Sequence, residues 1–222
     1  MCFSATASFT AAAVIGSIGV VTWRAAKKPG EKFLGAVPFL FAVQQLAEGI
    51  VWLSFTKPGW SEMQVPASLG FLSFAWIIWP ILIPYAVLKL EHPGIRREML
   101  IILCIIGLVS GAYALFLMLF AYPVPVIEKF HIDYRIDEDY RSNTLSMVRQ
   151  TAYVFSTVVA LFISSVRGMK VLAIGNLIAL GITYFFYRNA LPSTWCFFAA
   201  ILSLIIYWII QIQPADKKPE MG

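Results

Sequence analysis

Glu48 is a carboxylate in the middle of an apolar stretch, FAVQQLAEGIVW at 41–52. The chain has twelve acidic residues, and the other eleven fall in predicted connections or tails. A charge at the bilayer centre costs roughly 2.5 to 3.5 kcal/mol on insertion scales. An acid inside a membrane helix is therefore a candidate for binding a proton, a cation or another ligand, and we expect Glu48 to face the interior of a helix bundle.

The neighbours of Glu48 on its own helix are also polar or aromatic. At 100° per residue, Phe41, Gln44, Gln45, Glu48 and Trp52 share an arc of about 100°. Candidates for contact from other helices, chosen by depth, are Trp76, Tyr113, Arg149, Gln150, Tyr153, Tyr184 and Cys196. Except for Phe41 and Cys196, these residues form the predicted ligand- or proton-binding site.

Arg149 is the expected counter-ion of Glu48, because its long side chain can reach down from the outer mouth of the bundle. Without such a partner, burial would favour the protonated carboxyl group. The alternative is that Gln44, Gln45 and Glu48 only join helices through hydrogen bonds, with no ligand.

The helices that must position these residues follow from composition. The chain is 59% hydrophobic and 13% charged, whereas soluble domains carry about 25% charged residues. Continuous apolar runs long enough to span about 30 Å of hydrocarbon predict helices rather than barrel strands. The seven predicted spans are Ala5–Trp23, Phe33–Ser54, Val65–Leu88, Met99–Tyr122, Val148–Val166, Val171–Tyr187 and Leu191–Ile212. The predicted fold is all-α, a seven-helix transmembrane domain over 1–212.

The basic residues predict the orientation of this bundle. Connections 24–32, 89–98 and 167–170, with the tail after 212, carry eleven Lys and Arg, against six in the alternate connections. By the positive-inside rule the N-terminus lies outside and the C-terminus in the cytoplasm. Loop 123–147 then faces outward, and the tail 213–222 is predicted to be disordered and cytoplasmic.

Two further patterns bear on packing. Residues 130–136 of the loop alternate apolar and polar side chains, which is the period of a short strand with one side on the bundle mouth. This segment is either a lid over an outward cavity or a solvated loop. Ser8, Ala12 and Gly16 are small residues at four-residue spacing, which favours close helix contact. We therefore expect the first helix to be central, and we expect Pro80 and Pro84 to bend the third.

The residue types that are missing exclude several functions. Both histidines, His92 and His131, fall in loops, so a haem or a zinc site within the bundle is not expected. The seventh span has no lysine for a retinal Schiff base, and no span has an aspartate for a two-aspartate protease. Basic residues flank helices and form no continuous patch, so no nucleic-acid partner is expected.

Cys2 is the candidate metal ligand. If Met1 is removed, the free amine and thiol of Cys2 could bind a soft metal such as copper. The alternative is that Phe3 anchors at the membrane interface while Ser4 or Thr6 caps the first helix.

The opening MCFSATASF and the pattern QQxxEGxxW at 44–52 resemble an uncharacterised family of bacterial multi-pass membrane proteins. The resemblance extends over most of the chain. It implies a location in the bacterial inner membrane and marks Cys2 and Glu48 as family features, and it implies no activity.

Three functions remain open at this point. The first is a binding or transport protein with an outward-facing cavity lined by Glu48, for a proton, a small cation or an amphipathic molecule. The second is a membrane enzyme acting on lipid or isoprenoid, with Glu48 as acid and base and a metal at Cys2. The third is an accessory or sensory subunit that contacts the lipid bilayer and a partner in an oligomer or membrane complex.

Overall fold

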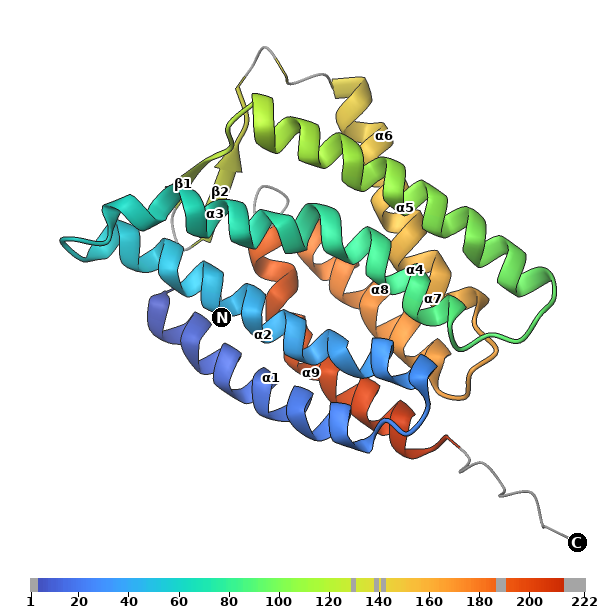
Figure 1. Cartoon of the computed structure of the whole chain (residues 1–222). Helices are drawn as coiled ribbons and strands as arrows, with labels where there is room; N and C mark the ends of the chain where they lie inside the picture. The colour runs from blue at the N-terminus through green and yellow to red at the C-terminus, as the bar shows by residue number, and fades with distance from the viewer. Residues whose placement is uncertain (1–3, 129–130, 138–139, 141–142, 187–190, 214–222) are drawn as a thin grey trace, which may run out of the picture.

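The computed structural model describes residues 4–128, 131–137, 140, 143–186 and 191–213, and most of this part of the chain is helical (Figure 1). Two segments, η2 (Ser73–Ile78) and η4 (Phe155–Val159), are π-helices, and η1 (Ser61–Met63) is a 3₁₀ turn. The elements in order are α1 (Ala5–Ala25), α2 (Pro29–Thr56), η1 (Ser61–Met63), α3 (Gln64–Leu72), η2 (Ser73–Ile78), α4 (Trp79–Leu88), α5 (Ile95–Phe120), β1 (Val124–Glu128), β2 (His131–Arg135), α6 (Asn143–Val154), η4 (Phe155–Val159), α7 (Ala160–Ile163), α8 (Met169–Phe186) and α9 (Leu191–Gln211).

Each predicted span coincides with a helical segment. Five helices are long and apolar enough to cross a membrane: Ala5–Ala25, Pro29–Thr56, Ser61–Leu88, Ile95–Phe120 and Thr144–Ile163. Shorter apolar helical stretches at Met169–Phe185 and Phe198–Gln211 account for the last two spans. This architecture is the one expected of a helical membrane protein.

The all-α prediction is wrong at one place, where β1 and β2 form an antiparallel hairpin. Val124 pairs with Arg135, and Glu128 pairs with His131. The alternation in 130–136 correctly indicated the second strand. The first strand lies in the connection 123–147, which the sequence predicts as a loop. Pro125 is tolerated in this strand because a two-stranded sheet consists only of edges.

Helix α1 packs closely along α2, as its small residues predicted, but it lies at the side of the bundle. A Cβ built at Gly19 would lie 2.6 Å from the backbone nitrogen of Phe39, so only glycine permits this contact. The opposite face of α1 is exposed, with Val14, Val21 and Trp23 at its surface. The expectation of a central α1 is therefore wrong; α2, which touches α1, α3, α4 and α9, is the central helix (Figure 1).

The prolines of α4 create a second glycine-dependent contact. Pro84 has no N–H to donate to the carbonyl group of Pro80, four residues earlier. That carbonyl oxygen instead faces α5, where a Cβ at Gly107 would lie 1.8 Å from it. The backbones of α4 and α5 thus meet at the point where the helical hydrogen bond is missing.

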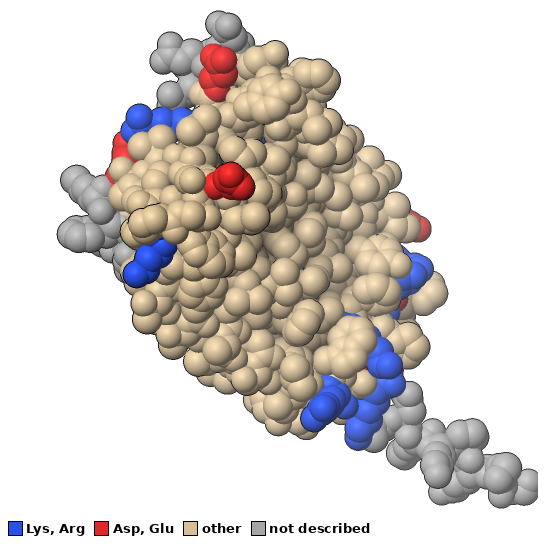
Figure 2. Space-filling model, turned by 60° about the vertical axis from the view of Figure 1, so that its left-hand side comes forward, with Lys and Arg blue, Asp and Glu red and all other residues tan. Residues whose placement is uncertain are grey.

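The basic segments meet at one end of the bundle. Gly30 lies against the carbonyl group of Lys89, and Gln213 donates to the carbonyl oxygen of Arg167 at 3.4 Å. Glu91 joins the α4–α5 and α7–α8 connections, accepting from the hydroxyl groups of Ser164 and Ser165, each at 2.7 Å. Figure 2 shows Lys and Arg gathered at this end, mixed charges at the hairpin end, and an almost uncharged surface between them on the face drawn.

The contact between Pro80 and Gly107 predicts that Gly107→Ala destabilises the protein. Its Cβ meets a backbone oxygen that cannot move without bending α4, so we expect a loss of at least about 1–3 kcal/mol. The measurement is thermal unfolding in detergent, followed by circular dichroism. The matched control is Gly181→Ala, where a Cβ meets nothing within 4 Å; helix propensity predicts an unchanged or higher melting temperature there. Equal melting temperatures for the two variants would contradict this account.

Candidate functional site

A pocket of about 1180 Å³ extends into the bundle beside α2. Its walls come from α2, η2, α4, α6, η4, α7, α8 and α9, and the β1–β2 hairpin borders it. The polar and aromatic lining residues include Phe41, Gln44, Trp76, Trp79, Arg149, Gln150, Tyr153, Thr157, Asn176 and Tyr184. A concave, mainly apolar space with a few polar groups is the usual form of a small-molecule site.

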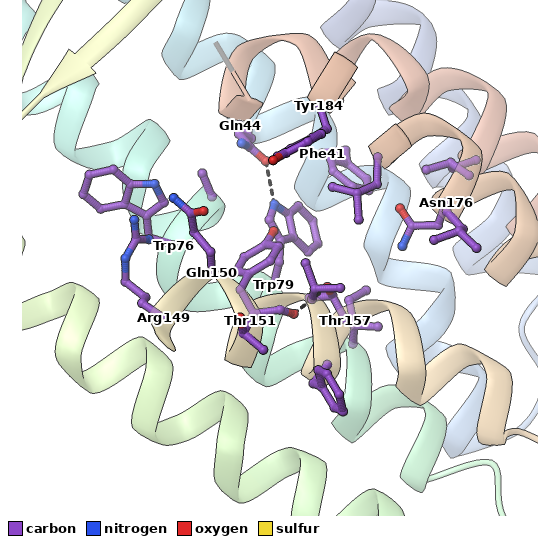
Figure 3. A pocket seen from close by; sticks show the side chains of 18 of the residues that line it. Phe41, Gln44, Trp76, Trp79, Arg149, Gln150, Thr151, Thr157, Asn176 and Tyr184 are labelled. Atoms are coloured by element: carbon purple, nitrogen blue, oxygen red, sulfur yellow. Dashed lines mark hydrogen bonds between the residues drawn. The ribbon is translucent and has the colours of Figure 1, made fainter. Parts of the chain in front are cut away.

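Arg149 is the cationic side chain at membrane depth in the lining. Its guanidinium group lies over the ring of Trp76, 5.0 Å from the centroid, and its Nε is buried without a hydrogen-bond partner in the described structure. Tyr113 and Tyr153 are close enough to interact with it electrostatically. Figure 3 shows Arg149 against Trp76, with Gln150 alongside. Stacking on an indole holds the guanidinium plane in place and leaves its edge free to donate hydrogen bonds.

Gln44 faces the same pocket from α2. Its Oε1 accepts a hydrogen bond of 2.7 Å from the indole nitrogen of Trp79, and Phe41 stacks on Trp79 with ring centroids 4.1 Å apart. Since the oxygen is engaged, the amide group presents its two N–H donors to the pocket. Figure 3 shows this pair beside Tyr184.

Both π-helical segments contribute to the pocket wall. Ala75 and Trp76 belong to η2, and Phe155 and Thr157 belong to η4. The break at η2 has a local cause, because Pro80 cannot donate to the carbonyl group of Trp76. π-Helical turns occur often at functional sites, so two of them lining one pocket are independent support for a binding role.

The hairpin forms the charged border of the pocket. Arg135 pairs with Glu128 and also donates to Asp133 at 3.3 Å. These two acceptors raise the pKa of Arg135, so the guanidinium stays charged. Tyr134 stacks on Phe71 of α3, with centroids 5.2 Å apart, which fixes the hairpin to the bundle. The acids at this border are therefore already partnered.

The structure divides the predicted site residues between two places. Glu48, Gln45 and Trp52 are buried in α2, as their shared face predicted, with Glu48 fully inaccessible and its Oε2 accepting from Gln45 at 3.3 Å. These three residues and Tyr113 of α5 are not among the pocket-lining residues. The predicted residues that do line the pocket are Gln44, Trp76, Arg149, Gln150, Tyr153 and Tyr184. A functional role for Glu48 stays a prediction.

The expected ion pair between Glu48 and Arg149 is not formed. Arg149 lies on α6, which packs against α5, and its guanidinium reaches Trp76 instead. Matching residues by depth could not distinguish these partners, because depth says nothing about which helices are neighbours.

No group of three or more His, Cys, Asp or Glu side chains that could hold a metal occurs within the described residues. Cys2 lies outside those residues, and so does the side chain of Cys196. The soft-metal hypothesis at Cys2 therefore stays a prediction.

Sequence reasoning missed Trp79, Thr157 and Gly181 as lining residues. The spacing of three between Trp76 and Trp79 places the two indoles on nearby faces of one helix. Gly181 lines the pocket, and a Cβ there would meet nothing within 4 Å. No pattern in the sequence indicates that this glycine borders open space.

Comparison with known proteins identifies a family without an assigned activity. The family described as "Family of unknown function (DUF6629)" matches residues 1–220, and the chain belongs to it. No curated protein and no solved structure matches the chain.

The hydrogen bond between Gln44 and Trp79 predicts that the stability cost of Gln44→Leu depends on whether residue 79 is Trp or Phe. Gln44→Leu leaves the buried indole N–H of Trp79 without an acceptor and should cost about 1–3 kcal/mol. The same change made in a Trp79→Phe background removes no hydrogen bond and should cost much less. Thermal or denaturant unfolding of the three variants tests this difference. Additive effects of the two substitutions would show that the bond contributes nothing.

Proposed function

We propose that this member of the DUF6629 family binds an amphipathic small molecule with an anionic head group in the pocket between α2, α6 and α8. The observation that carries the proposal is Arg149, a half-buried guanidinium stacked on Trp76 with a buried nitrogen that lacks a hydrogen-bond partner in the described structure. A cation held in this way is expected to receive its counter-ion from a ligand.

The polar end of the pocket is rich in donors. Arg149, Gln150 and the amide N–H groups of Gln44 supply hydrogen bonds there. Among the lining residues the carboxylates are Glu128 and Asp133, and both contact Arg135. This charge distribution favours an anionic ligand, such as a carboxylate or a phosphate ester, over a small cation in this pocket.

Apart from a few further polar side chains, among them Thr157 and Asn176, the remainder of the lining is apolar. Leu34, Val37, Leu161, Leu180 and Ile206 offer only hydrocarbon, and a ligand with a head group alone would leave these surfaces without contacts. An amphiphile would fill both regions, and the surrounding bilayer is a ready source of such molecules.

The location is also a proposal. The basic segments gather at the end opposite the hairpin, and the positive-inside rule places that end in the cytoplasm of a bacterial inner membrane. The hairpin, the 123–147 connection and the polar end of the pocket then face outward. Proton or cation binding at Glu48 is a second candidate function, supported by the complete burial of this carboxylate at membrane depth.

The first test is Arg149→Gln in protein reconstituted into lipid nanodiscs. Binding of labelled hexadecanoate is followed by scintillation proximity, with competition by dodecanoate, dodecyl phosphate, dodecanol and dodecyltrimethylammonium. The two anions should compete, and the alcohol and the ammonium should not. Loss of a charged hydrogen-bond partner should weaken anion binding about ten- to a hundred-fold, and Arg149→Lys should retain part of the affinity.

The matched control is Arg96→Gln, which removes the same charge from an exposed position at the start of α5. It should bind hexadecanoate as the wild type does. Preferential competition by the ammonium compound, absence of any binding, or an Arg149→Gln variant with unchanged affinity would each overturn the proposal.

The second test separates Glu48 from the pocket. Glu48→Gln keeps the shape of the side chain and an oxygen acceptor for Gln45, and Glu48 does not line the pocket. We therefore expect hexadecanoate affinity within about twofold of the wild type and a similar melting temperature, since a twofold change is well under 1 kcal/mol.

Proton flux in proteoliposomes loaded with a pH-sensitive dye tests the second candidate function. Flux that is abolished by Glu48→Gln would support proton binding at Glu48. A large loss of hexadecanoate affinity would instead bring Glu48 into the anion site.

A further inference from the structure

The end of the pocket away from Arg149 is closed by aliphatic side chains. Leu34 from α2, Leu172 from α8, and Leu202 and Ile206 from α9 line it, and each is at most 5% exposed. All four belong to one continuous hydrophobic core with Leu161 of α7. We call these four lining residues the pocket floor.

The packing at and beyond the floor is tight. A Cβ at Gly175 of α8 would lie 3.4 Å from a methyl group of Leu202, so the side chain of Leu202 is pressed against α8. Closer to the basic end, a Cβ at Gly168 would lie 2.8 Å from the ring of Trp208. The hydrocarbon region of the pocket therefore ends at the floor.

The distance from the polar end to the floor can be read along α2. Gln44 and Leu34 both line the pocket, and their separation of ten residues corresponds to about 15 Å of helix. The hydrocarbon core of a bilayer is about 30 Å thick, so one leaflet is about 15 Å deep. The apolar region is thus as long as one leaflet is thick.

We infer that the pocket takes a linear hydrocarbon tail of ordinary membrane-lipid length, and that Leu34, Leu172, Leu202 and Ile206 set the longest tail that it accepts. This inference rests on the proposed function, because Arg149 must hold the anionic head group for the floor to act as a limit. The ligand class is then a long-chain fatty carboxylate or a phosphate ester with a comparable tail.

Gly181 marks the passage between the head group and the tail. It lies in α8 one turn before Tyr184, and the space where its side chain would be is empty to 4 Å. Because a Cβ there meets no protein atom within 4 Å, a larger side chain has room to project into the route of the tail. Gly181→Leu is therefore a blocking variant that should fold normally, since leucine favours a helix more than glycine does.

The experiment measures competition against labelled hexadecanoate in nanodiscs by octanoate, dodecanoate, hexadecanoate and tetracosanoate. For the wild type, tetracosanoate should compete about ten times less well than hexadecanoate, because the excess tail must be forced against a packed core. Leu202→Ala should narrow the difference between tetracosanoate and hexadecanoate several-fold, since it removes part of the floor. Leu204→Ala, at an exposed position on the same helix, should behave as the wild type.

Gly181→Leu provides the second line of evidence where Leu202→Ala folds poorly. It should reduce hexadecanoate binding at least tenfold, while Ile178→Phe on the exposed face of α8 should not. Absence of hexadecanoate binding to the wild type would refute the proposed function itself. If hexadecanoate and tetracosanoate bind with equal affinity and both depend on Arg149, the limit on tail length is refuted and the proposed function stands. Unchanged selectivity in a folded Leu202→Ala protein, or normal binding by Gly181→Leu, would also refute it.

Discussion

The polar groups of this protein have to find partners inside the bundle, because hydrocarbon offers them none. The consequences are visible in several contacts. Gln44 accepts from the indole of Trp79, Glu48 accepts from Gln45, and the carbonyl group of Pro80 lies against Gly107. The bond between Gln44 and Trp79 joins α2 to α4, whereas the bond between Gln45 and Glu48 lies within α2. Hydrogen bonds between helices and close backbone contacts are the interactions that associate helices in hydrocarbon. Among the pocket-lining side chains, Arg149 has a buried nitrogen without a hydrogen-bond partner in the described structure.

The two ends of the bundle meet this requirement in different ways. At the basic end, Glu91 accepts three hydrogen bonds from Ser164 and Ser165, and Glu31 accepts from the backbone N–H groups of Lys27 and Lys28. These carboxylates hold the connections together. At the other end the charged hairpin borders the pocket. The result is a pocket that is polar near the hairpin and closed near the basic connections.

Much of the fold could be predicted, because a helix crossing hydrocarbon must be long and apolar. The seven predicted spans coincide with helical segments, and the burial of Gln44, Gln45 and Glu48 follows from the cost of polar groups in lipid. Six of the expected site residues line the pocket, because polar and aromatic side chains at membrane depth turn toward the interior of the bundle. The pairing of β1 with β2 and the lateral position of α1 could not be predicted, because both depend on contacts between segments and not on local pattern.

The sequence by itself determined that the chain forms apolar helices, which faces of them carry polar groups, and which connections are basic. These properties depend on the composition and period of each segment. Only the tertiary structure decided that Arg149 lies on Trp76 and not beside Glu48. It also decided that two π-helical turns line the same pocket and that Gly181 borders empty space. The reason is physical: depth and period give each residue a height and a direction, whereas the neighbour it meets depends on how all the helices pack around one another.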